Sequence, residues 1–353
     1  MSANRKNVHV VLASRPGEDK EATENNFRFE ETAYPDDPVE DSVLLVRNLY
    51  LSLDPALRCR LNEDTGVEYV KPWKIDETVD GFGGIGEVIV SRNPCFKAGD
   101  LVIPNFLWPW KLYFTVAAET VRKIETQNVT WSPTLYLSVF GLTGLTAYLG
   151  VKEKGHVVRG ANQTMVVSAA AGSTGSFAGQ IAKAMGCERV IGTCGSDAKV
   201  KCLTDELGFD AAINYKTESV MERLTTLCPN GIDIYFDNVG GEISNEIIRQ
   251  MNENSHIILC GQIADYNKRV EYPPPIPSDI SDILKTRNIC RDRFLVLMYR
   301  DQFETATQAL MEMYNADKIK VKETIETGLE NAGKAFLSMM RGGNTGKQLL
   351  DLR

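Results

Sequence analysis

The glycine-rich segment at residues 165–180 constrains the fold of this chain more than any other feature. It reads M-V-V-S-A-A-A-G-S-T-G-S-F-A-G-Q, an apolar run that enters a turn of small residues. Phe177, Ile181 and Met185 then recur with helical spacing, and Gly186 provides a helix stop. A strand, a glycine turn and a helix N-terminus can together hold a pyrophosphate through backbone N–H groups and the helix dipole. The segment predicts a dinucleotide-binding unit, although such turns also occur at ordinary strand–helix junctions.

The residues that follow alternate between short apolar runs and amphipathic stretches. This alternation is typical of a parallel, doubly wound sheet, whose ligands bind at the carboxyl ends of the strands. We therefore predict an α/β unit. Its further strands are expected at residues 189–195, 211–215, 232–237 and 256–261, and its further helices at residues 197–207, 218–227 and 242–252.

The end of the second strand bears on which dinucleotide is bound. A unit that binds NAD usually has Asp or Glu there, about 20 residues past the glycine turn. Here residues 193–196 read T-C-G-S, Lys199 follows, and Tyr215 ends the third strand. A cation in place of an anion suits the 2′-phosphate of NADPH, which is therefore favoured. Two alternatives remain: Lys199 as a solvated helix residue, and Asp197 as a displaced acid, although a helix N-cap is the favoured role for Asp197.

Composition limits the partners and the compartment. The 353 residues carry 39 basic and 47 acidic side chains, a formal charge of −8, which argues against a nucleic-acid-binding surface. No apolar run approaches the roughly 18 residues of a membrane span, and the N-terminus does not resemble a signal peptide. The eight cysteines are scattered without a C-x-x-C pair, which is typical of reduced thiols. We expect a cytoplasmic protein.

The same composition limits the chemistry. His9, His156 and His256 have no cysteine or carboxylate at metal-ligand spacing, so no metal site is predicted. Ser168 and Ser173 lack the G-x-S-x-G pattern of a nucleophilic serine.

Residues outside the nucleotide unit show a different sequence pattern. Strands interrupted by Pro and Gly are predicted at residues 43–53, 84–90 and 100–103, and residues 133–150 are predicted to be helical. After residue 311 we expect an extended run at 319–325, a helix at 329–340 and a strand at 347–352 that returns to the N-terminal domain. The predicted domains are residues 1–131 with 308–353, and residues 132–307. The proline run at 272–277 is expected to be extended, either as a cleft edge or as a surface linker.

Four motifs connect the chain to a known family. They are L-S-L-D-P-A-L-R at 51–58, V-D-G-F-G-G-I-G at 79–86, F-D-N-V-G-G at 236–241 and G-G-N-T-G-K at 342–347. With the glycine-rich turn they resemble the zinc-independent leukotriene B4 dehydrogenase/prostaglandin reductase branch of the medium-chain dehydrogenase/reductase superfamily. The resemblance covers nearly the whole chain. It implies a Rossmann doubly wound parallel sheet plus a β-rich GroES-like substrate domain.

The resemblance also implies an activity. It is the NADPH-dependent reduction of a double bond conjugated to a ketone, notably the C13=C14 bond of 15-keto-prostaglandins, which yields the 13,14-dihydro product. The implied partner is a small lipid substrate. A general alkenal or quinone reductase is the alternative, and a non-catalytic NADPH-binding protein is the second. Monomer and homodimer both stay open.

The family pattern assigns roles to residues of this chain. Tyr266 is implied as the catalytic donor to the enolate oxygen, while a proton comes from solvent. Leu107 stands where the family carries a tyrosine, so a polar contact to the substrate is absent. The implied cofactor-binding residues are Gly172, Ser173, Thr174, Gly175, Lys199, Tyr215, Asn238, Cys260, Gly261, Gln262, Ile263, Ala264, Asp265, Tyr266, Phe294, Leu295, Val296 and Asn344. The implied substrate residues are Phe106, Leu107, Leu295, Val296 and Leu297, and Trp108 is expected beside them in an apolar cleft.

Overall fold

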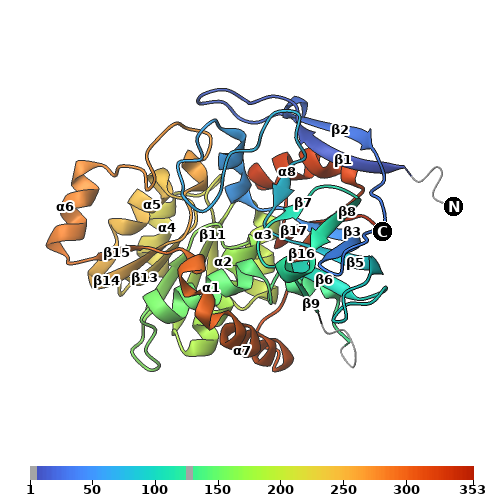
Figure 1. The fold of residues 1–353 in the computed structure, drawn as a ribbon. Helices are drawn as coiled ribbons and strands as arrows, with labels where there is room; N and C mark the ends of the chain where they lie inside the picture. Colours follow the sequence, from blue (N-terminus) through green and yellow to red (C-terminus); the bar gives the residue numbers. More distant parts are fainter. Residues whose placement is uncertain (1–5, 125–129) are drawn as a thin grey trace. The chain divides into compact units, whose positions relative to one another are not determined.

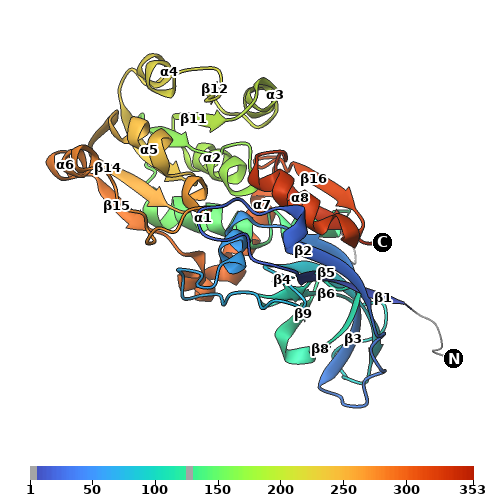
Figure 2. The ribbon, with the colours of Figure 1, turned by 90° about the horizontal axis from the view of Figure 1, so that it is seen from above.

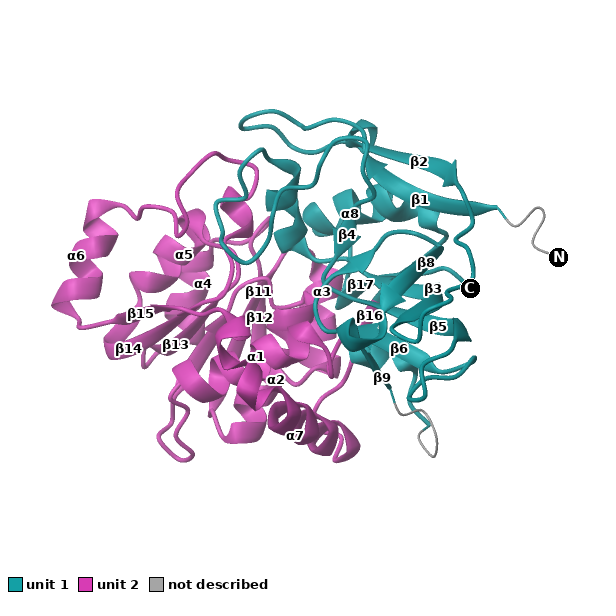
Figure 3. Ribbon diagram, in the orientation of Figure 1, with its two compact units in different colours: residues 1–137, 324–353 teal, residues 138–323 magenta. Residues whose placement is uncertain are grey.

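The computed structural model describes residues 6–124 and 130–353, which form two compact units (Figure 3). The first five residues, considered above for a leader, lie outside this description. Residues 1–137 with 324–353 form what we name the split unit, and residues 138–323 form the central unit. Within the described residues, no helix is both long enough and apolar enough to cross a membrane.

The predicted domain division requires a correction at residues 308–323. The structure places them in the central unit, because helix α7 (Phe303–Asn315) packs against α1 (Leu142–Lys154). The ring of Tyr314 also meets Phe140 edge-on at 5.6 Å between centroids. Farther along, Gln180 donates to the carbonyl of Lys320 and accepts from its backbone N–H.

The central unit is built on a six-stranded sheet whose neighbouring strands are all parallel (Figure 1). The strand order is β12-β11-β10-β13-β14-β15, so the chain starts in the middle, builds one side and returns to build the other. This order is that of a Rossmann doubly wound sheet and confirms the predicted fold class. The strands are β10 (Thr164–Val167), β11 (Arg189–Cys194), β12 (Ala211–Asn214), β13 (Ile232–Asp237), β14 (Met251–Leu259) and β15 (Cys290–Arg293).

Both faces of this sheet are covered (Figure 2). On one face, alternate strand residues such as Val166, Ile191 and Tyr235 pack against α4 (Val220–Leu227), α5 (Gly241–Ile248) and α6 (Ser278–Thr286). On the other face lie α1 and α2 (Ser173–Met185), which contact each other. A Cβ at Gly150 of α1 would lie 3.0 Å from the ring of Phe236, so this helix sits close to the sheet.

Several element boundaries differ from the predictions. The helix predicted for residues 242–252 ends at Ile248, because Met251 is buried and pairs with Ile232 as a strand residue. His256 therefore lies within β14 and not at its start. Residues 133–150 are not one helix: a 3-10 turn covers Pro133–Leu137 before α1 begins. The helix predicted at 197–207 is α3 (Asp197–Lys201) followed by a π-helical turn, Cys202–Glu206.

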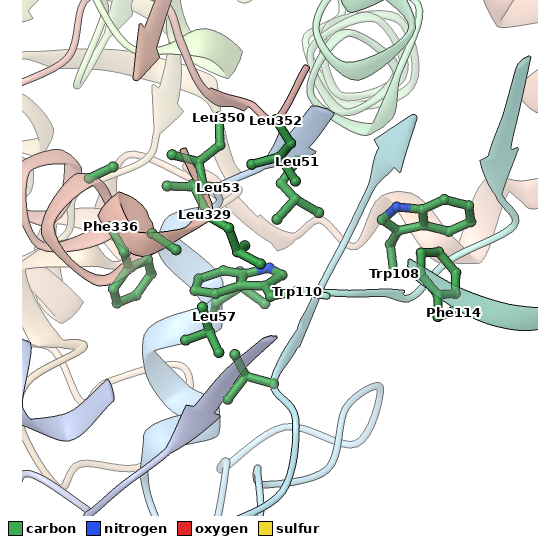
Figure 4. Close-up of a cluster of buried hydrophobic side chains, with 14 of the residues drawn as sticks. Leu51, Leu53, Leu57, Trp108, Trp110, Phe114, Leu329, Phe336, Leu350 and Leu352 are labelled. Carbon is green, nitrogen blue, oxygen red and sulfur yellow. The ribbon is translucent and has the colours of Figure 1, made fainter. Parts of the chain in front are cut away.

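The split unit is built on an antiparallel seven-stranded sheet whose core is shown in Figure 4. Its main path runs β16-β17-β3-β5-β6-β9, and β8 also pairs with β3. The tail strand β17 lies beside β3, which confirms that the C-terminus returns to this unit. Its strands are β3 (Val43–Ser52), β5 (Gly84–Ser91), β6 (Leu101–Pro104), β8 (Tyr113–Ala117), β9 (Val121–Lys123), β16 (Glu323–Thr327) and β17 (Lys347–Asp351). Two small sheets accompany them, each of two antiparallel strands: β1–β2 (Asn7–Leu12, Phe27–Thr32) and β4–β7 (Asp80–Gly81, Trp108–Pro109).

A buried ion pair joins the C-terminal tail to the first part of the split unit. Lys347, the first residue of β17, donates to the carboxylate of Asp54 and to the carbonyl of Leu53. Ser52 Oγ donates to the second oxygen of the Asp54 carboxylate over 2.6 Å. Lys347 and Asp54 are both buried, as is Phe336 of α8 (Ala332–Met340) in the same unit. Two of the sequence motifs singled out above, 51–58 and 342–347, therefore meet in this ion pair.

Candidate functional site

The turn between β10 and α2 has the geometry of a phosphate-binding turn. Gly172 precedes the first residue of α2, and Ser176 N–H to Gly172 C=O is the first backbone hydrogen bond into the helix. The N–H groups of the first turn therefore have no partner within the helix. A Cβ at Gly175 would lie 2.5 Å from the carbonyl oxygen of Ala169, and one at Gly172 would lie 3.2 Å from it. Neither glycine tolerates a side chain easily, as a turn built around a phosphate requires.

A hydroxyl from the neighbouring helix reaches this turn. Ser173 Oγ donates to Thr143 Oγ1 over 2.8 Å, and Thr143 Oγ1 donates to the carbonyl of Ser138. Thr143 lies in the first turn of α1, so two helix N-termini lie close together here. Sequence reasoning did not find Thr143, because nothing in the 133–150 segment marks where its helix begins.

The ends of β11 and β12 bring two lysines and a tyrosine around Gly195. A Cβ at Gly195 would lie 2.9 Å from Tyr215 Oη and 3.2 Å from Lys216 Cε. Lys199 is half-buried, and desolvation, together with the nearby positive charge of Lys216, lowers its pKa. Two cations that repel each other suit a dianionic group between them, so Lys216 joins the predicted pair Lys199 and Tyr215. It directly follows Tyr215 in sequence, which is the signal that could have found it.

Asp197 is not the helix cap that the sequence favours. The cap is Ser196, whose Oγ accepts the N–H of Lys199 over 3.3 Å. Asp197 is instead the first residue of α3, and its carboxylate accepts Asn214 Nδ2 over 2.7 Å. Asn214 ends β12, so the carboxylate is held against the next strand.

Asn238 is anchored at the carboxyl end of β13. Its backbone N–H donates to Ser168 Oγ over 2.9 Å, and its side-chain Nδ2 donates to the carbonyl of Ser168 over 2.8 Å. Ser168 follows β10, so these bonds join the ends of adjacent parallel strands. Ser168 was considered above only as a nucleophile, and the structure shows that its hydroxyl positions Asn238.

The loop after β14 brings Tyr266 to the same edge of the sheet. Cys260 and Gly261 donate their N–H groups to the carbonyl of Asp237, both over 2.9 Å. Residues 263–265 form a single 3-10 turn, which Tyr266 terminates. A Cβ at Gly261 would lie 3.3 Å from Tyr266 Oη and 3.2 Å from the carbonyl oxygen of Asn238. The tyrosine hydroxyl therefore lies over Gly261 and close to Asn238.

The thiol of Cys260 lies in an environment that keeps it neutral. Burial, with a smaller contribution from the charge of Asp237, raises its pKa to about 12. A neutral thiol is a weak nucleophile.

The segment after β15 begins beside this edge. Phe294 N–H donates to the carbonyl of Leu259 over 2.9 Å, and its buried ring stacks on Tyr299 at 5.5 Å. Val296 is buried, whereas Leu295 and Leu297 are partly exposed. The ring of Phe294 therefore packs inside the central unit, and its backbone is the part that continues from the sheet edge.

The predicted residues of the split unit fall into two groups. Phe106 stacks on Phe82 at 5.4 Å, and Phe82 contacts Tyr69 at 6.4 Å, so Phe106 ends a row of three aromatic rings. Leu107 beside it is 40% exposed. Trp108 was expected in the same cleft, but it is fully buried: its Nε1 donates to Asn48 Oδ1 and its ring meets Phe114 edge-on. The alternation of a strand points Trp108 away from the face of Leu107.

Asn344 lies in the tail turn of the split unit. It is largely buried, and its Nδ2 donates to the carbonyl of Gly346 over 2.7 Å. Its amide therefore fixes the turn that leads into β17.

Among the described residues, no group of three or more His, Cys, Asp or Glu side chains is arranged to hold a metal ion. His156 and His256 do meet, with ring centroids 4.2 Å apart. Burial and the neighbouring ring lower the pKa of His256.

Two family models match the chain. The model described as the N-terminal domain of oxidoreductase matches residues 9–124, and the model described as zinc-binding dehydrogenase matches residues 173–312. The first match lies in the split unit and the second in the central unit.

Several curated proteins resemble the chain over nearly its whole length. YfmJ of Bacillus subtilis, which is named as a proposed NADP-dependent oxidoreductase, is 41% identical and covers 97% of this chain and 96% of its own. The NADPH-dependent curcumin reductase of Escherichia coli is 34% identical over 98% of this chain and 97% of its own. Prostaglandin reductase 1 of Rattus norvegicus is 36% identical over 93% and 94%. The crystal structure of CurA from Vibrio vulnificus in complex with NADPH superposes with a TM-score of 0.87 at 34% identity, covering 98% of this chain and 99% of that one.

Proposed function

Because the chain belongs to the zinc-independent branch of the medium-chain dehydrogenase/reductase superfamily of oxidoreductases, we propose that it reduces carbon–carbon double bonds conjugated to a carbonyl group, with NADPH as the reductant. Relatives named for NADPH-dependent reduction, at 34% identity over 98% of this chain, support the cofactor and the reaction type. The observation that carries the proposal is the Tyr266 hydroxyl, held over Gly261 and close to Asn238.

The residues at the strand ends suit the parts of NADPH. The first turn of α2 offers the pyrophosphate backbone N–H groups that have no partner within the helix, in a turn too tight for a Cβ at Gly172 or Gly175. Lys199, Tyr215 and Lys216 would hold the 2′-phosphate, because two cations and a phenol converge there. Asn238 and the loop 260–266 would border the nicotinamide. When bound, NADPH supplies a hydride and becomes NADP⁺.

Tyr266 carries the catalytic role in this proposal. Hydride addition to the β-carbon of an enone moves the π electrons onto the carbonyl oxygen, which becomes an enolate oxygen. The Tyr266 hydroxyl donates a hydrogen bond to that oxygen and stabilises the charge as it develops. The α-carbon then takes a proton from water. In total one hydride and one proton are added, the double bond becomes a single bond, and the ketone is restored.

For the substrate class, we propose alkenals and enones of varied shape as the principal substrates. The curcumin reductase relative supports this breadth. Leu107 supports it as well, because it is exposed and offers no hydroxyl to orient a particular polar group.

A second candidate is preference for 15-keto-prostaglandins. It rests on prostaglandin reductase 1 at 36% identity and on segments 251–262, 272–275 and 293–297, which resemble prostaglandin reductase 2. A long apolar substrate would suit the exposed side chains beside Phe106.

The test follows NADPH oxidation by absorbance with three substrates: curcumin, a short 2-alkenal and 15-keto-prostaglandin E2. Wild type is compared with Tyr266→Phe. Removing the phenol hydroxyl should lower turnover by about 10²–10³-fold, the usual cost of one donor to a developing oxyanion. Tyr272→Phe is the matched control, because it removes a phenol from the same segment and should leave turnover unchanged.

The outcomes separate the candidates. Comparable rates on all three substrates support the general reductase, and a strong preference for the prostaglandin supports the second candidate. If Tyr266→Phe keeps the wild-type rate, the catalytic assignment is wrong. Binding of NADPH without reduction of any of the three would favour a non-catalytic binding protein.

A further inference from the structure

Asp237 is a buried carboxylate that accepts its hydrogen bonds from neutral donors. It ends β13 and is 1% exposed. Burying an ionised carboxylate is costly unless hydrogen bonds satisfy its oxygens. Here neutral donors satisfy the oxygens. They include groups in the turn that follows β13 and in the loop that follows β14, which carries Tyr266.

The first oxygen, Oδ1, holds the turn that follows β13. It accepts the backbone N–H groups of Val239 and Gly240 over 3.0 and 2.9 Å. It also accepts the hydroxyls of Tyr235 and Ser244, each over 2.9 Å, and that of Ser168 over 3.4 Å. These bonds fix the residues between β13 and α5.

The second oxygen, Oδ2, reaches the loop that follows β14. It accepts Gln262 Nε2 over 3.0 Å, and the same nitrogen donates to the carbonyl of Gly261. Gln262 is buried and fits tightly, because a Cβ at Gly240 would lie 2.3 Å from its Oε1. The Asp237 carboxylate therefore joins the two loops that border the proposed nicotinamide site.

The backbone reinforces the same connection. The Asp237 carbonyl accepts the N–H groups of Cys260 and Gly261, and the carbonyl of Val239 accepts that of Ala264 over 3.0 Å. The bond from Gln262 ties a side chain of the 261–266 loop to the Asp237 carboxylate. Gln262 lies four residues before Tyr266, and Gly261 lies directly beneath its hydroxyl.

We propose that Asp237 is a positioning residue, whose carboxylate acts through Gln262 to hold the 261–266 loop so that the Tyr266 hydroxyl stays over Gly261. The inference rests on the proposed function, since it concerns where the enolate donor is held. It identifies a determinant of the reaction that touches neither substrate nor cofactor.

The charge state of residue 237 is the testable part. In Asp237→Asn, one acceptor oxygen becomes an NH₂ group of nearly the same size. If that NH₂ faces Gln262, two donors oppose each other. If it faces the other way, it opposes the N–H groups of Val239 and Gly240. Either way the bond network loses at least one link, and the fold keeps the same side-chain volume.

The experiment measures enone turnover in Asp237→Asn, Gln262→Glu and the double variant. We expect Asp237→Asn to lower turnover about ten- to a hundredfold, because small displacements of a reacting group have effects of this size. Gln262→Glu places two carboxylates together and should also be impaired. The double variant restores a donor opposite an acceptor, and it should recover most of the lost turnover. A double variant no better than either single variant overturns the proposal.

A double-mutant cycle separates positioning from general loss of structure. If Asp237 acts through Tyr266, Asp237→Asn should cost much less in a Tyr266→Phe background than in wild type. Fully additive effects would overturn the proposal. Ser244→Ala is the matched control, because it removes another donor to the same carboxylate but leaves Gln262 in place, and it should keep wild-type turnover.

Hydrogen–deuterium exchange gives a readout that needs no substrate. In Asp237→Asn, the amides of residues 260–266 should exchange faster, while those of β10 and β11 keep their protection. Unchanged exchange in 260–266 would overturn the inference even if turnover falls. If wild type reduces no enone, the proposed function fails, and the exchange result still decides whether Asp237 orders the loop.

Discussion

Two carboxylates, Asp54 and Asp237, are buried in the two units of this chain and are stabilised in different ways. Asp54 in the split unit pairs with the ammonium of Lys347 and accepts one hydroxyl, from Ser52. Asp237 in the central unit accepts two backbone N–H groups, three hydroxyls and one amide.

The difference corresponds to what each carboxylate joins. The Asp54 pair joins residues 293 positions apart, so one long, flexible lysine brings the tail to its place. The Asp237 network joins loops 25 residues apart at one edge of one sheet. Fixed backbone dipoles are better suited to define geometry than a flexible ammonium group. The ion pair therefore holds the C-terminal tail to the split unit, while the neutral donors around Asp237 fix the geometry of two loops at the candidate site.

Removing the cation should have the largest effect. Lys347→Met leaves Asp54 buried without its partner, and we expect the free energy of unfolding to fall by about 3–5 kcal/mol. Urea unfolding, monitored by tryptophan fluorescence, measures it. The double variant Asp54→Asn/Lys347→Met removes the uncompensated charge and should regain much of the loss. If it is as unstable as Lys347→Met alone, packing and not charge explains the effect.

Removing one hydroxyl donor to each carboxylate should lower the free energy of unfolding by a smaller amount, and by a different amount for each carboxylate. Ser52→Ala takes away the hydroxyl donor to Asp54 and should cost about 2 kcal/mol. Ser244→Ala leaves five other donors on Asp237 and should cost about 1 kcal/mol. The same urea titration measures both losses of unfolding free energy. Equal losses would show that the number of remaining donors does not matter.

The smallest effect is expected at alkaline pH. Burial, followed by the charge of Asp237, raises the pKa of Tyr235 well above its usual value. Below pH about 10 the phenol is protonated in both folded and unfolded chains. Above that, the unfolded chain loses the proton and the folded chain keeps it, so stability falls as pH rises. Tyr235→Phe should show a flatter stability profile above pH about 10, and an identical slope would contradict the buried, protonated phenol.

The sequence was sufficient to predict a parallel, doubly wound sheet and five of its six strands, because glycine stops and apolar strands mark each βα unit. The sixth strand, β15 (Cys290–Arg293), was not predicted, because its residues C-R-D-R form no apolar run. Gly186 and Gly208 both take a positive φ where helices were predicted to stop. The predicted end of helix α5 was wrong, because the apolar spacing of residues 242–252 continues into a buried strand that starts at Met251. Local periodicity does not reveal which neighbour a residue will pair with.

The candidate site divides in the same manner. Glycines and the Lys199–Tyr215 pair have local signals, since a turn or a strand end places them. Thr143 and Asp237 have none of comparable strength, because their contacts join elements far apart in the chain. Lys216 was missed although it directly follows Tyr215. Trp108 was misplaced because an apolar run does not show which of its side chains face the core.

The pairing of β17 with β3 has a consequence for biosynthesis. All six strands of the central sheet exist once residue 293 has been translated. The split unit must wait for residues 347–351. Until the ribosome delivers Lys347, Asp54 has no counterion and residues 50–52 of β3 lack their strand partner. The nascent chain thus passes through a stage in which one half can be native while the other still exposes an unfinished sheet, and that stage is where a chaperone would have most to protect.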